Sequence, residues 1–308
     1  MNTSREKNSI VNCLLLRAKI LSKLRKFFAK RQILEVTTPL LLPTTNPAPF
    51  LNSFQCDNLY LQTSPEFAMK ILLTHCNKDI YQICKAFRKD EQGRLHNPEF
   101  TILEWYRINF DHHDLMDEMN DLLKCIINAP QARRYSYREI FEKFLDINPH
   151  DNTLSQLKLL AKKKHLSISS LVNDKDTWLQ LLFTHLIEPY LGNKEPVFIY
   201  DYPPSQAMLA KIRCYKKYNL ASRFEVYYRG IELANGFHEL NDPQEQRKRF
   251  QSDLLKRRQL NLPPVSLDEH FLSALTKLPN CSGVALGVDR LILLVTKYAS
   301  LGELLSYP

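Results

Sequence analysis

The sequence predicts an α+β domain built around an antiparallel sheet, and three observations lead to that class. Both ends of the chain show helical periodicity, and the β-type runs between them are joined by hairpin-like turns. Strands and helices do not alternate as βαβ units. Neither a G-x-G-x-x-G nor a G-x-x-x-x-G-K-[ST] pattern occurs. A nucleotide site would therefore have to be built without a Rossmann fingerprint or a P-loop.

The composition is that of a globular protein large enough to bury a core. Of its 308 residues 44% are hydrophobic and 24% are charged. The 7 cysteines are scattered and never form a C-x-x-C pair, which argues against a zinc site and favours a reducing compartment. No apolar run approaches the length of a membrane span, and no signal-peptide pattern is present. We expect a cytoplasmic protein with no membrane partner.

The net charge of +9 leaves two interpretations open. A basic surface can attract phosphates or an acidic partner. It can equally reflect a surface that carries more lysine than glutamate. We interpret the basic run 162–164 as the solvated face of a helix.

The first hundred residues predict two helices. Apolar residues recur at helical spacing over the first thirty positions, at Ile10, Leu14, Ala18, Leu21, Leu24 and Phe28. A short β-type run, 35–39, follows and ends in proline. The segment Thr63-Ser64-Pro65-Glu66 predicts the start of the second helix, with a hydroxyl N-cap, proline at the first helical position and an acid in the first turn.

Two strands follow, separated by the polar loop 92–98. We expect the first strand to run from Tyr81 to Glu91, with Arg88 and Asp90 pointing the same way. In the second, from Phe100 to Ile108, a period of two places on one face Phe100, Ile102, Glu104, Tyr106 and Ile108. That face carries both aromatic rings and an acid.

The rest of the chain predicts a mostly helical insertion at about 130–195 within a single domain, 1–308. Strands are expected at 197–202 and 224–228, with a turn at Arg229-Gly230 and a further strand from Ile231. A helix starts at Asp242-Pro243-Gln244-Glu245 with a capping-box pattern. A last β-type run, 283–287, leads into a helix at 288–298.

Two arginines are candidates for binding phosphates. Activation of a carboxylate by ATP needs cations beside the phosphates, a stacking surface for adenine and a pocket for the acid itself. Arg88 and Arg290 suit the first task, because a guanidinium group binds two oxygens at once. The alternatives are a surface cross-strand ion pair between Arg88 and an aspartate, and a buried pair of Arg290 with Asp289 or another acid.

Two glutamates are candidate magnesium ligands. Glu232 and Glu239 flank the segment 233–238, and carboxylates are usual ligands of ATP-bound magnesium. A spacing of seven places them on opposite faces of a regular strand. A shared metal therefore requires a bulge or turn, which we expect at Asn235-Gly236.

Taken together, these segments resemble the class II aminoacyl-tRNA synthetases. The first helix with 35–39 resembles their motif 1, segment 87–100 their motif 2 and segment 283–290 their motif 3. Segments 63–66 and 230–240 are similar to the lysyl branch. The sequence starts at the motif 1 helix, so we expect no anticodon-binding domain. It is thus similar to the truncated lysyl-tRNA synthetase paralogues that act as elongation factor P–(R)-β-lysine ligases, over nearly its whole length.

The resemblance implies a six-stranded antiparallel sheet flanked by helices, and a homodimer. It implies that ATP, with Mg²⁺, activates (R)-β-lysine as its adenylate. The product is then transferred to a lysine side chain of translation elongation factor P. Because that factor resembles an acidic, tRNA-shaped protein, a basic docking surface suits it. We do not expect tRNA as the acceptor.

The resemblance also assigns residues. Arg88 would bind the α-phosphate and Arg290 the γ-phosphate as the catalytic pair, and Phe100 would stack on adenine. The remaining ATP contacts would be Lys89, Asp90, Asn97, Glu232, Leu233 and Gly287. Lys89-Asp90 stands where the family usually has Asn-Glu. The amino-acid site would comprise Ser64, Pro65, Glu66, Glu104, Tyr106, Glu239 and Ala285, with Glu232 and Glu239 near the magnesium ion.

Two features of this set suit the amino acid. Several acids around one pocket suit a substrate with two ammonium groups. Ala285 stands where lysyl-tRNA synthetases typically have glycine, and we hypothesise that its methyl group biases the pocket against α-lysine.

Three alternatives stay open. A tRNA ligase is disfavoured by the missing anticodon domain, and an adenylating relative such as ammonia-dependent asparagine synthetase by the lysyl-type motifs. A non-catalytic regulatory relative would tend to lose the motif arginines and metal carboxylates, but Arg88, Arg290, Glu232 and Glu239 are all present.

Overall fold

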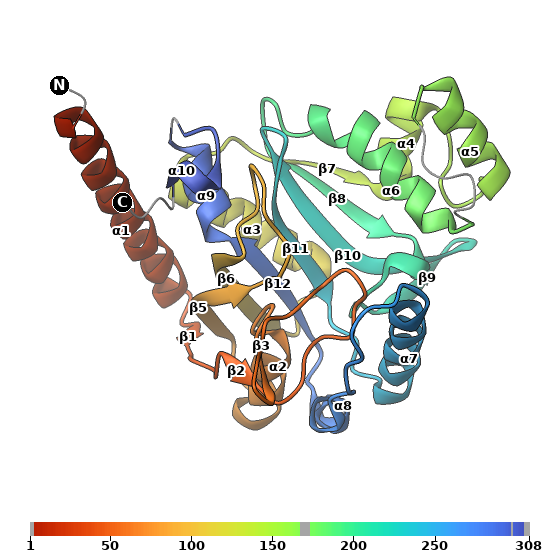
Figure 1. Cartoon of the computed structure of the whole chain (residues 1–308), viewed down its shortest axis with the longest axis horizontal. Helices are drawn as coiled ribbons and strands as arrows, with labels where there is room; N and C mark the ends of the chain where they lie inside the picture. The colour runs from red at the N-terminus through yellow and green to blue at the C-terminus, as the bar shows by residue number, and fades with distance from the viewer. Residues whose placement is uncertain (1–2, 167–172, 297, 305–308) are drawn as a thin grey trace. The chain divides into compact units, whose positions relative to one another are not determined.

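The computed structural model describes residues 3–166, 173–296 and 298–304, which form two compact units (Figure 1). The first comprises Met1–Asn128 and Glu239–Pro308, and the second Ala129–His238. None of the described helices is both long enough and apolar enough to cross a membrane.

The first unit is built on four strands in the order β1-β5-β6-β12. Their bounds are β1 (Leu34–Glu35), β5 (Ile80–Phe87), β6 (Glu99–Ile108) and β12 (Cys281–Gly287). β1 runs parallel to β5, and β6 is antiparallel to both β5 and β12. The register of β6 is unbroken on both sides, so the predicted period of two holds along the whole strand.

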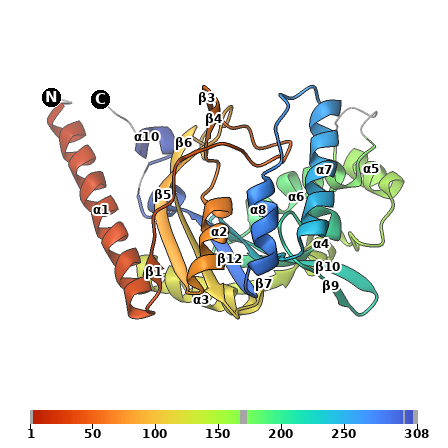
Figure 2. The same cartoon turned by 90° about the horizontal axis from the view of Figure 1, so that it is seen from below.

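Helices cover both faces of this four-stranded sheet. On one face lie α1 (Thr3–Lys30) and α3 (His112–Ile127), where Phe28 packs 5.4 Å from the Trp105 ring and Trp105 Nε1 donates to Glu118 of α3. On the other face lies α2 (Glu66–Cys76), which Figure 2 shows across the strands. α2 packs on α8 (Glu269–Ala274) through stacked rings of Phe67 and Phe271, 4.0 Å apart.

Smaller elements complete the first unit. A second sheet has the order β2-β4-β3, with β2 (Leu41–Leu42), β3 (Gln55–Cys56) and β4 (Leu59–Leu61). The remaining helices are α7 (Pro243–Gln259), η3 (Leu275–Lys277), α9 (Val288–Leu294) and α10 (Leu301–Leu304). α7 starts as predicted, because the Asp242 side chain accepts from the backbone N–H groups of Gln244 and Glu245.

The second unit contains five strands and three α-helices in its described part. The strands are β7 (Arg133–Ser136), β8 (Val197–Tyr202), β9 (Ile212–Tyr215), β10 (Tyr218–Tyr228) and β11 (Ile231–His238). They follow the order β7-β8-β10-β11, and β9 pairs with β10. The helices are α4 (Tyr137–Leu145), α5 (Leu154–Lys163) and α6 (Lys175–Leu186), with the 3₁₀ turns η1 (Glu188–Tyr190) and η2 (Pro204–Gln206).

The core of the second unit is aromatic. Tyr137 lies 4.7 Å from Phe141 and 4.8 Å from Tyr202, measured between ring centroids. The predicted turn between β10 and β11 is confirmed: Arg229 has φ 54° and Gly230 φ 69°. Positive φ at both central residues matches the twist of a two-residue hairpin.

The α+β class is confirmed, but the expected strand set is not. The described parts of the two units contain nine strands besides the small sheet, where six were predicted, and two pairs, β1 with β5 and β7 with β8, are parallel. β1, β7 and β9 are only two to four residues long. Such short strands lack the alternation that a sequence pattern needs. The predicted single domain over 1–308 stays a prediction.

Candidate active site

Three carboxylates gather in the first unit, between the sheet and α2. Glu66 comes from the first turn of α2, Glu104 from β6, and Glu239 begins the chain segment after β11. The side chains of Glu104 and Glu239 are 2% and 1% exposed. Tyr106 lies beside Glu104 on the same face of β6 and donates its hydroxyl to Glu104 Oε1 at 2.6 Å. The predicted shared face of Glu104 and Tyr106 is thus confirmed.

A lysine that the sequence analysis did not select links two of these acids. Lys70 Nζ lies 2.6 Å from Glu66 Oε1 and 2.6 Å from Glu239 Oε2. Burial disfavours the charge on Lys70, but Glu239 and then Glu66 outweigh burial and raise the pKa of Lys70. The one signal in the sequence was the i,i+4 spacing of Glu66 and Lys70. That spacing is common on exposed helix faces, so it does not indicate a buried site.

Glu104 keeps one oxygen without a hydrogen-bond partner in the described structure. Its Oε2 is buried and accepts no hydrogen bond, whereas Oε1 accepts from Tyr106. Burial raises the pKa of Glu104, and the negative charge of Glu66 raises it further. A buried acceptor without a donor is costly, and such groups often mark the place of a ligand. The cluster is therefore suited to bind a cation that donates hydrogen bonds, such as an ammonium group.

Strand β12 forms the floor of this cluster. Gly283 pairs with Tyr106 and Ala285 pairs with Glu104. A Cβ atom on Gly283 would lie 2.3 Å from Tyr106 Cε1 and 2.5 Å from Glu239 Oε1, so a side chain does not fit there. Gly283 belongs to the site although the sequence analysis did not select it. Its spacing of two from Ala285 was the available signal.

The start of α2 differs from the prediction by one residue. The helix begins at Glu66, and Pro65 is the N-cap without a side-chain capping bond. The Ser64 hydroxyl lies 3.4 Å from the Glu66 backbone nitrogen, at the long end of hydrogen-bond distances. Ser64 and Pro65 still lie directly before Glu66, beside the acid cluster.

Arg88 does not lie in a strand, contrary to the prediction. β5 ends at Phe87, and the chain turns so that Asp90 has a positive φ of 69°. Lys89 and Asp90 are exposed in this turn. Arg88 and Asp90 therefore do not share a strand face. Aspartate tolerates the left-handed region better than most residues, which explains how a turn can replace the expected strand.

The structure brings Arg88 and Phe100 together. The Arg88 guanidinium carbon lies 5.1 Å from the centre of the Phe100 ring. Arg88 Nε donates to the Thr63 carbonyl at 3.3 Å, and Nη1 lies 3.6 Å from Glu91. The acid beside Arg88 is therefore Glu91 and not the aspartate that the alternative interpretation expected.

Arg290 reaches the polar loop between β5 and β6. Its Nε donates to the Leu95 carbonyl at 3.2 Å, and its Nη2 lies 2.9 Å from His96 Nε2. Because a guanidinium group cannot accept, His96 Nε2 must be the acceptor and therefore unprotonated. Burial and then the charge of Arg290 lower the pKa of His96, which agrees with this assignment.

Asp289 has a different partner from the one considered for it. Its Oδ1 lies 2.6 Å from Arg17 Nη1 of α1, and its Oδ2 accepts from the Thr101 backbone N–H at 2.6 Å. These bonds fix α1 and α9 to β6. Arg290 follows Asp289 at the start of α9, where Gly287 is the N-cap, and Asn97 in the loop donates to the Glu99 carbonyl at 2.5 Å.

In the second unit, Glu232 and Leu233 lie at a β-bulge. Val226 pairs with Ala234 and Tyr227 with Glu232, so Leu233 is the extra residue on β11. A bulge in β11 was predicted, but its predicted position at 235–236 is wrong, because those residues pair regularly with β10. Within the described ranges, no group of three or more His, Cys, Asp or Glu side chains could hold a metal ion by itself.

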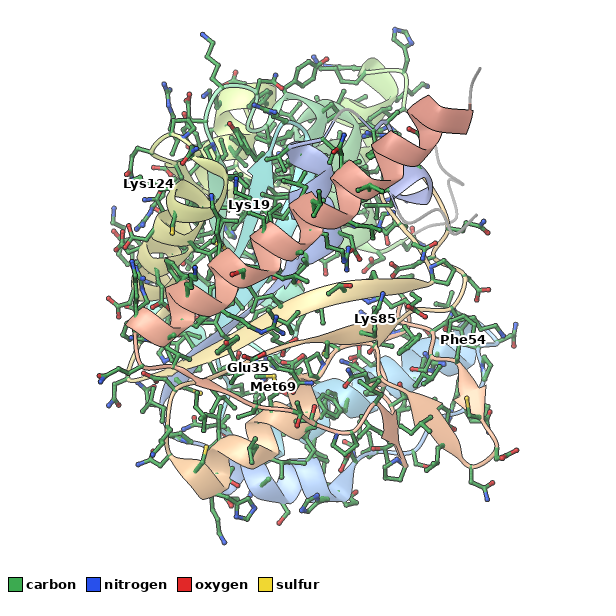
Figure 3. All side chains as sticks on the ribbon, turned by 90° about the vertical axis from the view of Figure 1, so that its left-hand side faces the viewer. Lys19, Glu35, Phe54, Met69, Lys85 and Lys124 are labelled. Carbon is green, nitrogen blue, oxygen red and sulfur yellow. The ribbon has the colours of Figure 1, made fainter. Side chains whose placement is uncertain are left out.

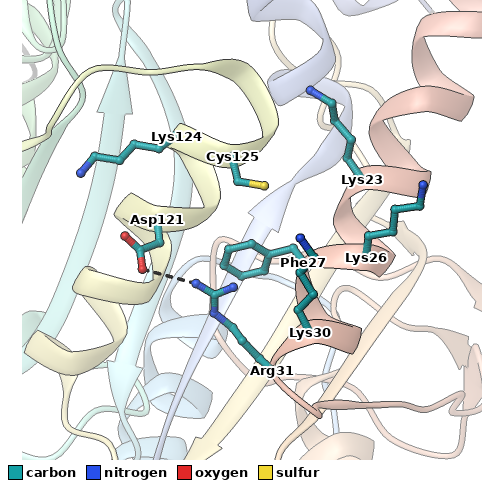
Figure 4. Close-up of a pocket in the computed structure, with 8 residues that line it drawn as sticks. All are labelled: Lys23, Lys26, Phe27, Lys30, Arg31, Asp121, Lys124 and Cys125. Atoms are coloured by element: carbon teal, nitrogen blue, oxygen red, sulfur yellow. Dashed lines mark hydrogen bonds and ion pairs between the residues drawn. The ribbon is translucent and has the colours of Figure 1, made fainter.

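A separate groove lies on the opposite side of the first unit's sheet. Its volume is about 590 Å³, and it lies between α1 and α3 (Figure 4). Its lining is basic, with one acid that is paired to an arginine: Lys23, Lys26, Phe27, Lys30, Arg31, Asp121, Lys124 and Cys125. None of the predicted site residues lines this groove.

Known proteins resemble this chain over nearly its whole length. A family profile described as tRNA synthetases class II (D, K and N) matches residues 3–308. A protein of Vibrio atlanticus (strain LGP32) named elongation factor P–(R)-β-lysine ligase is 47% identical over 304 residues, which cover 95% of this chain and 94% of that protein. A protein of the same name from Edwardsiella ictaluri (strain 93-146) is 47% identical over 306 residues, covering 96% and 94%.

Proposed function

We propose a function from the premise that this chain belongs to the class II tRNA synthetase family and, within it, to the elongation factor P–(R)-β-lysine ligases. The chain is an enzyme that activates (R)-β-lysine with ATP as the aminoacyl-adenylate. It then transfers the aminoacyl group to a lysine side chain of translation elongation factor P. The names and near full-length matches of its relatives support this reaction.

The observation that carries the proposal is the charge of the acid cluster. Glu66, Glu104 and Glu239 gather around Lys70, so three carboxylates face one ammonium group. Without a ligand, burial and the charge of Glu66 raise the pKa of Glu104 to about 8, and bound ammonium groups would favour its ionised form. With all three carboxylates ionised against Lys70, the cluster has an excess of two negative charges. A diamino acid that has become an adenylate carries two ammonium groups and no free carboxylate. The two charges balance, and the buried Glu104 Oε2 gains a donor.

The ATP site is proposed on the resemblance and on the contacts around Arg88. Arg88 binds the α-phosphate and Phe100 stacks on adenine, which their proximity supports. Arg290 binds the γ-phosphate from the start of α9. The other proposed ATP contacts are Lys89, Asp90, Asn97, Glu232, Leu233 and Gly287. Arg290 would exchange its present contacts with Leu95 and His96 for phosphate oxygens.

Magnesium is proposed to arrive with ATP. Mg²⁺ keeps several waters and is usually held by one or two carboxylates together with substrate phosphates. The proposed donor set fits that pattern, because Glu232 and Glu239 would supply two carboxylates. When bound, the ion neutralises charge on the phosphates.

The transfer step needs little from the protein. The adenylate is already activated, so the neutral amine of the acceptor lysine attacks its carbonyl carbon. The bond from this carbon to the phosphate oxygen breaks, AMP leaves and the amine loses a proton to solvent. The enzyme therefore has to position the amine near the adenylate, which is a matter of orientation. The proposal therefore requires no dedicated base.

We also propose a cytoplasmic homodimer. α1 resembles motif 1, and it exposes Val11, Leu14 and Leu15, each more than half accessible. Exposed apolar residues clustered on one helix favour a protein partner. Mass measurement in solution tests this point, and a monomer at micromolar concentration would contradict it.

One incubation tests the reaction and its alternatives. The protein is mixed with ATP, with (R)-β-lysine or α-lysine, and with either elongation factor P or tRNA. We expect a covalent mass increase on elongation factor P that requires ATP and is larger with (R)-β-lysine. Labelling of tRNA alone would identify a tRNA ligase, and the absence of adenylate formation would favour a non-catalytic relative.

A further inference from the structure

Lys70 is the one charged residue of the acid cluster to which the proposed reaction assigns no role. Its side chain is 1% exposed, so water cannot solvate the ammonium group. Its Nζ instead contacts Glu66 and Glu239 at equal distances of 2.6 Å. A buried lysine in contact with two carboxylates is uncommon, because each buried charge must be compensated where it lies.

The two acids that Lys70 contacts come from separate parts of the chain. Glu66 lies one turn before Lys70 on α2, and Glu239 begins the segment that follows β11. Lys70 fixes one oxygen of Glu66 and one oxygen of Glu239. Glu104 is held instead by Tyr106, whose hydroxyl donates to Glu104 Oε1. Lys70 therefore fixes two of the three carboxylates and leaves Glu104 Oε2 as an acceptor without a donor.

We propose that Lys70 is a positioning residue for the amino-acid site, which holds Glu66 and Glu239 in the orientation that binds the substrate. This inference rests on the proposed function. The inference adds a role for Lys70 to the proposed function. The protein supplies one ammonium group of its own, and the site takes a substrate that supplies two more. Lys70 acts through the two carboxylates and does not touch the reacting atoms.

A simple countercharge role predicts the opposite result from a positioning role. If Lys70 only reduced the negative charge, its removal would leave a more negative pocket, and a dicationic substrate would bind more tightly. If Lys70 positions Glu66 and Glu239, its removal lets these repelling carboxylates turn away from each other. The substrate then loses its acceptors and binds more weakly. Measured affinity for the amino acid distinguishes the two roles.

The test is the exchange of pyrophosphate into ATP that depends on (R)-β-lysine, measured for wild type and Lys70→Met. Methionine is unbranched and only one atom shorter than lysine, and it removes the charge. We expect the KM for (R)-β-lysine to rise about tenfold or more, the scale of a lost charged hydrogen bond, with the KM for ATP nearly unchanged. An unchanged or lower KM for the amino acid, or an equal rise in both KM values, would overturn the inference.

A matched control is available on the same sheet. Lys85 of β5 also pairs with a glutamate, Glu99, at 2.9 Å, but it is 41% exposed. It pairs in register with Thr101, the residue that α1 contacts, and therefore lies on the face away from Glu104. Lys85 is labelled in Figure 3. We expect Lys85→Met to leave both KM values unchanged.

If thermal melting shows that Lys70→Met does not fold, a second comparison tests the same inference. Glu66→Gln is compared with the double variant Lys70→Met/Glu66→Gln, in which one cation and one anion are removed together. In the double variant Glu239 still loses its contact with Lys70. We expect its KM for (R)-β-lysine to exceed that of Glu66→Gln severalfold, and equal values would overturn the inference. A wild type without exchange activity would instead refute the proposed function, and the inference with it.

Discussion

The two units each bury a cluster of charged residues, and the clusters differ in their balance. In the second unit, Arg223 of β10 contacts Glu225, the Asn235 side chain at 3.2 Å and the Gln206 carbonyl at 3.1 Å. The other oxygen of Glu225 accepts from the hydroxyls of Tyr202 at 2.7 Å and Tyr227 at 2.5 Å. Arg223 has Glu225 as its contacting anion and is also close enough to Glu232 for that charge to help raise the pKa of Arg223, and both oxygens of the Glu225 carboxylate have donors.

The acid cluster of the first unit is not balanced in this way. Two of its three carboxylates, Glu66 and Glu239, contact Lys70, and Glu104 Oε2 has no donor within the described structure. A balanced network with satisfied acceptors stabilises the fold, whereas an excess of one charge with an open acceptor is costly until a ligand arrives. Burial and charge alone do not separate the two clusters. The balance of donors and acceptors does.

The largest effect on stability is expected in the balanced cluster. Glu225→Gln keeps the size of the side chain but leaves Arg223 as a buried cation without its countercharge. Breaking a buried ion pair from one side costs about 3 to 5 kcal/mol in the free energy of unfolding. Chemical denaturation with urea measures this loss. A loss below about 1 kcal/mol would show that the Arg223 network is not the structural cluster described above.

A smaller effect, on specificity, is expected at the floor of the acid cluster. Ala285 pairs with Glu104, and its methyl group is the proposed barrier to α-lysine. One methyl group in a pocket changes discrimination by about tenfold or more. Ala285→Gly should therefore shift the ratio of pyrophosphate exchange with the two amino acids toward α-lysine by about that factor. If the preference does not change, the hypothesis for Ala285 is refuted.

The smallest effect is expected for a partly buried acid outside both clusters. Burial raises the pKa of Asp253 in α7 to about 6, and the nearby Lys256 only partly offsets this. Because the folded state favours the protonated form, ionisation of Asp253 destabilises the protein above pH 6 and not below pH 4. Asp253→Asn should raise the melting temperature by a few degrees at pH 7.5 and by less at pH 4.5. An equal change at both pH values would contradict this assignment.

Much of the site could be predicted from local patterns. The period of two along β6 placed Glu104 with Tyr106, and the unbroken pairing with β5 and β12 preserved that order. The turn at 229–230 was predicted correctly because a glycine stands in a short connection between two strand-like runs. These features depend on neighbours in the chain, which a sequence pattern records.

The missed features depend on contacts between distant segments or on local irregularity. Lys70 was missed because its role depends on Glu239, 169 positions away, as the difference between the residue numbers shows. The predicted strand 81–91 was too long, because residues 88–91 contain neither glycine nor proline to indicate the turn at Asp90. The bulge was placed at 235–236 because glycine favours bulges, whereas the extra residue is Leu233.

The central claim is that the acid cluster, unlike the Arg223 network, exists to bind the amino acid. Glu104→Gln tests it most directly, because it removes a carboxylate that has one unused oxygen while it leaves an acceptor for the Tyr106 hydroxyl. We predict that exchange dependent on (R)-β-lysine falls about a hundredfold or more in kcat/KM, while the melting temperature stays the same or rises. Exchange within about threefold of wild type, or a loss of stability like that expected for Glu225→Gln, would contradict the account.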